Sequence, residues 1–241
     1  MSLQRGFSLI ELAIVLVIVT ILIGGLAVPL SAQIQARRIA ETQRTLEEAK
    51  EAVIGYARTH PIAGALGYRH LPCPDSVGND GKEDRSGDAC SSPSGLLPWV
   101  DLGVASQDAW GNRLRYAVVG QFADKGTNGG FSASMPLPRP APIEICSTHL
   151  CSSPDVATDV SFVIISHGPN GWGAQNLNNA PGSLQAPPNG LDEVDNLDTN
   201  SRYISRAPTQ PNTPSGEFDD FSTWVSFSRL IPSVCPAGGC P

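Results

Sequence analysis

The stretch Gly6-Phe7-Ser8-Leu9-Ile10-Glu11-Leu12, followed by an unbroken apolar run to Leu30, decides the fold of this chain. Residues 12–30 form a run of 19 residues without a charge, dominated by Ile, Leu and Val. As a helix rising about 1.5 Å per residue, this run roughly matches the ~30 Å hydrocarbon core of a bilayer. The sequence therefore begins with a helix that is apolar on all sides.

Two interpretations of this segment do not account for the charged residue Glu11. A secretory signal peptide would be cut near Ala27 or Ala32, but the apolar run is longer than a usual signal core, and Glu11 interrupts its start. A plain membrane anchor leaves Glu11 unexplained, because a carboxylate drawn to the centre of a membrane helix costs about 2.5–3.5 kcal/mol. A third interpretation gives this carboxylate a partner.

The segment Gly6–Glu11 resembles the cleavage and methylation motif of type IV prepilins and type II secretion pseudopilins. The resemblance implies that a prepilin peptidase cuts after Gly6 and methylates the new N-terminal Phe7. It also implies that Glu11 pairs with the amino terminus of a neighbouring subunit during assembly, which would relieve the cost of an unpaired intramembrane carboxylate. Residues 1–6 are then a leader peptide, and residues 7–30 are a transmembrane helix that becomes the filament core.

Beyond residue 31 the pattern becomes amphipathic, and we expect residues 31–60 to continue the helix. Gly55 weakens the helix late, and His60-Pro61 is predicted to end it, so one helix should run from Phe7 to about Arg58. Its apolar residues recur at close to helical spacing: Ile34, Ile39, Leu46, Ala49, Val53 and Tyr56.

Residues 61–241 are predicted to form a loop-rich periplasmic head, because most of the 24 glycines and 21 prolines lie there. Alternating or continuous apolar residues predict strands within it. The fold class that follows is α+β, with the long helix packed on a small antiparallel sheet. The predicted strands are Arg113–Val119, Val160–Ser166 and Phe221–Ser228, with further candidates at Ile143–Cys146 and Arg202–Ser205.

Two segments of the head resemble the major pseudopilin of type II secretion. The run 108–112, Asp-Ala-Trp-Gly-Asn, is similar to its D-P-W-G-N turn, with Ala109 where proline is usual. Residues 166–171 and 217–224 together are similar to its calcium loop. They depart from it because Asn170 stands at an aspartate position and about 45 residues separate the halves.

Calcium is the one metal that the head favours, because it binds six to eight oxygens on flexible acidic loops. The alternative, that these loops are solvated and bind no metal, stays open. The acidic loop 75–88 fails the EF-hand pattern, since Ser76 and Gly78 occupy ligand positions, and is interpreted as structural. The candidate calcium ligands are Asp192, Asp195, Asp198, Asp219 and Asp220.

The chain has six cysteines, an even number that indicates disulfides if the head is exported. Six cysteines allow fifteen pairings. The metal alternative is Cys146-x-x-His149-x-Cys151, which lacks a second ligand pair. Proximity in sequence favours the pairs Cys73–Cys90, Cys146–Cys151 and Cys235–Cys240.

A net charge of −7 without a basic cluster disfavours nucleic acid as a partner. Motifs of hydrolases, phosphate-binding loops and zinc peptidases are lacking, so we expect no enzyme and no required cofactor. The expected function is that of a structural subunit of a type IV pilus-like filament, with its head in the periplasm and its helix in the bacterial inner membrane before assembly. Expected partners are other subunits, the prepilin peptidase, the inner-membrane assembly platform and the bilayer.

Within this class, a type II secretion pseudopilin, serving protein export across the outer membrane, is favoured by the tryptophan turn and the calcium loop. A pilin or minor pilin of a surface pilus, serving adhesion, motility or DNA uptake, is the alternative favoured by the large head and its cysteines. A third alternative belongs to another class. It is a membrane-anchored periplasmic binding module that never polymerises.

Overall fold

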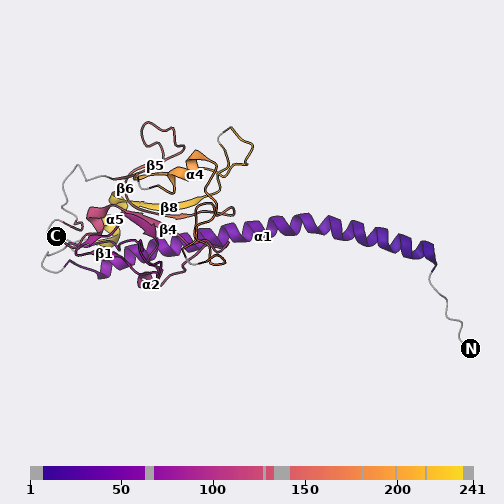
Figure 1. The fold of residues 1–241 in the computed structure, drawn as a ribbon, viewed down its shortest axis with the longest axis horizontal. Coiled ribbons are helices and arrows are strands. Elements are labelled where there is room, and N and C mark those ends of the chain that lie inside the picture. The colour runs from indigo at the N-terminus through magenta and orange to yellow at the C-terminus, as the bar shows by residue number, and fades with distance from the viewer. Residues whose placement is uncertain are drawn as a thin grey trace, which may run out of the picture. The chain divides into compact units, whose positions relative to one another are not determined.

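A computed structural model of the 241-residue chain describes residues 8–62, 68–126, 129–132, 142–180, 182–198, 200–214 and 216–235, and for residues 24–29 it describes the backbone alone. The chain divides into two compact units, Met1–Glu41 and Thr42–Pro241. Helix α1 (Leu9–Thr59) carries residues of both units, and every strand among the described residues belongs to the second (Figure 1).

Helix α1 begins at a capping box. The Ser8 backbone N–H donates to Glu11 Oε2 at 2.8 Å, and the Glu11 N–H donates to Ser8 Oγ at 3.3 Å. This reciprocal pair satisfies two donors that a helix start otherwise leaves unpaired. The helix ends at Thr59, next to His60-Pro61, because proline disfavours a helical conformation in the residue before it. The predicted end is confirmed within one residue, and Phe7 lies outside the described residues.

Of the side chains that the structure describes in residues 8–34, the large apolar ones are exposed, from 41% at Val19 to 90% at Leu9. An apolar surface of this size favours contact with lipid or with other apolar helices over contact with water. Within the part of the chain that the structure describes, no helix has the length and apolarity needed to cross a membrane. The transmembrane assignment of residues 7–30 is therefore not confirmed.

In the second unit, one face of α1 is buried. Leu46, Ala49, Val53 and Ala57 recur at spacings of three and four, which places them on one side of a helix, and each is at most 3% exposed. They pack in one core with buried residues of strand β6 (Ala157–Ser166). The predicted packing of this part of the helix on the head is confirmed (Figure 1).

Strand β6 is the centre of the sheet. Its C-terminal half pairs antiparallel with β4 (Arg115–Val118) along one edge and with β8 (Phe221–Ser226) along the other. Its first residues pair antiparallel with β5 (Ile143–Cys146). The last seven residues of β6 are all buried, which agrees with the continuous apolar run that predicted this strand.

Two further strands widen the sheet. Strand β3 (Ser94–Leu96) pairs antiparallel with β4, and β7 (Arg202–Ile204) pairs parallel with β5. The α+β fold class and all five predicted strands are confirmed. The sheet is mixed rather than wholly antiparallel, because residues 147–201 separate β5 from β7 and a connection of that length permits parallel pairing.

Short helices and strands lie within residues 61–241, which were predicted to be rich in loops. Strands β1 (Arg85–Ser86) and β2 (Ala89–Cys90) form a small hairpin. Three short helices connect the strands, namely α2 (Trp99–Leu102), α3 (Gly120–Ala123) and α4 (Leu191–Asp195).

The last two residues predicted for strand Phe221–Ser228 instead begin helix α5 (Phe227–Val234). Phe227, Leu230 and Val234 are buried at spacings of three and four, which is the period of a helix. The Phe227 ring also packs against Phe122, with 5.0 Å between the ring centroids. Burial of this helical face therefore outweighs the two-residue alternation that runs up to Phe227.

Candidate functional site

The three residues assigned to processing and assembly differ in what the structure describes. Gly6 and Phe7 lie outside the described residues. Glu11 lies in the first turn of α1, and its carboxylate accepts the Ser8 N–H. Glu11 thus has a local capping role beside the intersubunit role that the resemblance implies, and an experiment on this residue must separate the two.

The tryptophan turn is organised by Asp108, a carboxylate only 4% exposed. Its Oδ1 accepts the N–H groups of Trp110 and Asn112, both at 2.9 Å, and its Oδ2 accepts the Ser166 hydroxyl at 2.7 Å. The ring of Trp110 stacks on Phe221 of β8. The turn is therefore structural, and it joins the start of the 166–171 loop to the sheet.

Two of the three expected disulfides are present, Cys73–Cys90 and Cys146–Cys151. The second one takes up both thiols of the alternative metal motif, and the His149 ring of that motif contacts Asp192 instead. Cys240 lies outside the described residues, so the pair Cys235–Cys240 stays a prediction.

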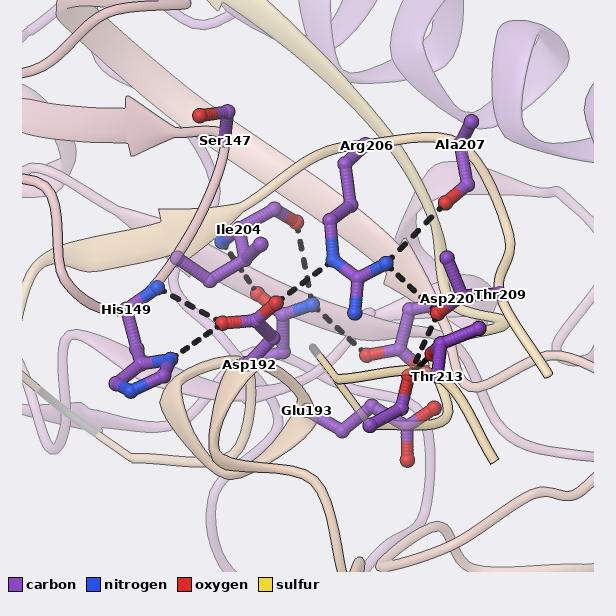
Figure 2. Close-up of polar contacts among 12 residues, drawn as sticks. Ser147, His149, Asp192, Glu193, Ile204, Arg206, Ala207, Thr209, Thr213 and Asp220 are labelled. Atoms are coloured by element: carbon purple, nitrogen blue, oxygen red, sulfur yellow. Dashed lines mark hydrogen bonds and ion pairs between the residues drawn. The ribbon is translucent and has the colours of Figure 1, made fainter. Parts of the chain in front are cut away.

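Asp192, a predicted calcium ligand, is the centre of a buried ion-pair network (Figure 2). Its Oδ1 accepts the His149 backbone N–H at 2.8 Å and lies 2.6 Å from His149 Nδ1. Its Oδ2 accepts Arg206 Nε at 2.7 Å. Burial alone would raise the pKa of Asp192, but the bonds from His149 and Arg206 outweigh burial and hold this pKa below its usual value. His149 and Arg206 thus contact both carboxylate oxygens of Asp192.

A different set of carboxylates lies close together. Oxygen atoms of Glu193, Asp219 and Asp220 fall within 4.8 Å of one another. Glu193 Oε2 and Asp219 Oδ1 are buried and accept no hydrogen bond within the described part of the chain. The other Asp219 oxygen accepts the Asn170 N–H at 3.0 Å, so this cluster adjoins the loop that resembles a calcium loop. Two unpartnered carboxylate oxygens, beside an Asp220 carboxylate whose Oδ2 accepts the side-chain N–H of Asn196, fit a calcium ion.

Two carboxylates of this cluster have raised pKa values. Burial, followed by repulsion from neighbouring carboxylates, raises the pKa of Glu193 to about 7. Burial also raises the pKa of Asp219 to about 7, with repulsion from Glu193 and Asp220 adding to it. Like charges at this spacing disfavour joint ionisation, and a divalent cation would reverse that preference.

The structure thus unites two of the five predicted calcium ligands and adds one that the sequence analysis missed. Asp195 lies on α4 outside the cluster, and Asp198 accepts the backbone and side-chain N–H groups of Asn200. Asp192, Asp195 and Asp198 are spaced by three in the sequence, and Glu193 falls outside that spacing. Adjacent helical residues point about 100° apart, which is why Asp192 contacts Arg206 while Glu193 faces Asp219.

Calcium is expected to stabilise the head more at pH 8 than at pH 5.5. The pKa values of Glu193 and Asp219 are higher in the folded state than their unfolded values of about 4. Without metal, the stability that their protonated forms contribute is therefore present at low pH and is lost as the pH rises from about 4 to about 7. Calcium chloride should restore it at pH 8, whereas protons compete with the metal at pH 5.5.

Thermal unfolding of the full chain in neutral detergent, with and without calcium chloride, measures this effect. Asp219→Asn is expected to weaken calcium binding about tenfold or more, because a charged ligand is lost. Asp88→Asn, at an exposed position, is the matched control. Equal melting temperatures with and without calcium at pH 8 would contradict the assignment.

Comparison with known proteins gives one result, at the N-terminus. Residues 1–27 match the family model described as the prokaryotic N-terminal methylation motif, and the matched segment contains Gly6, Phe7 and Glu11. No curated protein and no solved structure matches the chain.

Proposed function

We propose that this chain, which carries the N-terminal segment of a type IV prepilin-like protein, is a structural subunit of a pilus-like filament. The observation that carries the proposal is the methylation-motif match over residues 1–27. The chain is cut after Gly6 by a prepilin peptidase, is methylated at Phe7, and polymerises without a catalytic role.

The N-terminal half of α1 supports the proposal through its exposed apolar surface. Side chains from Leu9 to Ile23 offer that surface to lipid before assembly and to neighbouring helices afterwards. Glu11 lies at the start of the same surface, where a neighbour's amino terminus would neutralise its carboxylate. Before assembly the subunit is anchored in the bacterial inner membrane with its head in the periplasm.

We favour a type II secretion pseudopilin among the filament systems. The Asp108-centred tryptophan turn and the carboxylate cluster beside the 166–171 loop support this choice. The second candidate is a pilin or minor pilin of a surface pilus, and the size of the head and its two described disulfides favour it.

Peptide mass spectrometry of the N-terminus tests the proposal, on sheared surface filaments and on the membrane fraction of the native cell. We expect a chain that begins at methylated Phe7. Its presence in sheared filaments would favour a surface pilus, and its confinement to the envelope would favour a pseudopilus. An intact Met1, or a cut near Ala32, in cells with an active prepilin peptidase would refute the proposal.

A further inference from the structure

A polar cleft of about 400 Å³ opens on the head, away from the apolar core. Strand β4 and the residues before it form one wall, because Leu114 and Tyr116 point into the core while Arg113 and Arg115 alternate to the other side. Asp75 lies in another segment of the lining, which bridges Leu96 of β3. The cleft therefore brings two guanidinium groups and one carboxylate to the same space.

Arg113 is the group that is available to a ligand. Its guanidinium lies over the ring of Trp99, 4.1 Å from the centroid. Trp99 in turn packs against Gly81, where a Cβ atom would overlap the indole ring. The Arg113 side chain makes no hydrogen bond with the residues that the structure describes, although the charge of Asp75 acts on it and favours its charged form. Its five N–H donors are thus held by stacking and left unpaired, which suits a carboxylate.

Asp75 supplies an unpaired acceptor to the same cleft. It is 1% exposed, its Oδ2 accepts the Gly81 N–H at 2.7 Å, and its Oδ1 is buried with no hydrogen-bond partner in the described residues. Buried polar atoms normally find a partner, so an orphaned one needs an explanation. A ligand that donates a hydrogen bond to Asp75 Oδ1 would provide it.

The remaining lining is rich in neutral hydrogen-bonding groups and leaves one positive charge in excess. Arg115 is already bound, since its Nη2 donates to the carbonyl oxygens of Leu197 and Asp198. These carbonyls carry no charge, so Arg115 still counts toward the charge of the lining, and Arg113 is the arginine whose N–H donors are available. Asp75, whose charge acts on Arg113, is the single carboxylate of the lining. Hydroxyl and amide groups complete the walls, including those of Ser76, Ser92, Ser94, Asn79 and Gln175.

We propose that this cleft binds an acidic sugar, that is, a saccharide unit with a carboxylate beside ring hydroxyls. Arg113 binds the carboxylate through its paired N–H donors. A ring hydroxyl donates to Asp75 Oδ1, and the serine and amide groups of the walls bind the other hydroxyls. A singly charged acid matches the charge of the lining better than a zwitterionic amino acid, which would bring a positive charge as well.

The test is isothermal titration calorimetry on the full chain in neutral detergent. Glucuronate and galacturonate are titrated beside their neutral parents, glucose and galactose, and beside serine as a zwitterion. At least one uronate is expected to bind at least tenfold more tightly than its neutral parent and more tightly than serine. Equal affinity for acid and neutral sugar, tighter binding of serine, or no saturable binding of either uronate would overturn the proposal.

Variants of Arg113 test whether this residue binds the uronate. Arg113→Gln is expected to weaken uronate binding at least tenfold, whereas Arg229→Gln, an exposed arginine outside this cleft, leaves it unchanged. Arg113→Lys keeps the charge but loses the planar pair of donors, so it should give an intermediate loss, and it serves in place of Arg113→Gln if that variant unfolds. Equal binding by wild type and both Arg113 variants, or an equal loss in Arg229→Gln, would contradict the site.

Discussion

A Glu11→Ala chain is expected to be cut after Gly6 as the wild type is, yet to enter filaments at least about 100-fold less efficiently. In the proposed filament, the Glu11 carboxylate neutralises the amino terminus of a neighbouring subunit in apolar surroundings. Removing one partner of a buried ion pair costs about 3–5 kcal/mol, and each 1.4 kcal/mol changes an association constant about tenfold. Quantitative immunoblotting of sheared or pulled-down filaments, normalised to processed chain in the membrane, measures the effect.

The capping box complicates this variant, because Glu11→Ala also removes the acceptor for the Ser8 N–H. Two controls separate the roles. Glu11→Gln keeps an acceptor for Ser8 but no charge, and it should assemble as poorly as Glu11→Ala. Ser8→Ala removes the hydroxyl that accepts the Glu11 N–H, and it should cost only about 1 kcal/mol of helix stability and assemble nearly normally. Wild-type assembly by Glu11→Gln would show that capping, not charge, is what matters.

The second large effect is expected at Asp192, where an alanine should lower the free energy of unfolding of the head by about 3–5 kcal/mol. Asp192 is 1% exposed, and its loss removes the carboxylate that pairs with the largely buried Arg206 guanidinium, which lies over Phe218. The His149 loop loses two contacts as well. Urea unfolding of the full chain in detergent, followed by tryptophan fluorescence, measures the change.

Asp155→Ala is the matched control for this prediction. Asp155 also accepts hydrogen bonds from a neighbouring loop residue, Ser147, but it lies at the surface, so its removal should leave the unfolding midpoint nearly unchanged. An Asp192→Ala midpoint equal to that of the control would mean that Arg206 finds another partner. The network of Figure 2 would then not stabilise the head.

The elements predicted best are those whose apolar pattern matches their burial. Strand β6 is a nearly continuous apolar run because its last seven residues are buried on both faces of the sheet, and the end of α1 is marked by His60-Pro61. The sequence pattern did not predict helix α5. Phe227 fits the two-residue period of β8, and it also fits the helical spacing of Leu230 and Val234. Only tertiary packing, including the contact of the Phe227 ring with Phe122, decides between the two periods.

The sequence predicts which acidic segments form the candidate site better than which residues do, and calcium binding itself stays a prediction. Asp219 and Asp220 lie together with Glu193, next to the loop after β6. Asp192 also lies in an acidic segment, but its carboxylate contacts Arg206 and His149, which are 14 and 43 residues away in the sequence. Long-range partners of this kind leave no local pattern, so the sequence could not distinguish a metal ligand from an ion-pair partner.

The position of β6 has a consequence for when the head can fold. This strand needs β4 and β5, which precede it in the chain, and β8, which follows it only after residues 167–220. A chain emerging from synthesis or export therefore keeps one edge of its central strand open until β8 is available. An open apolar edge invites pairing with another chain, so the interval before β8 docks is when newly made heads are most prone to aggregate.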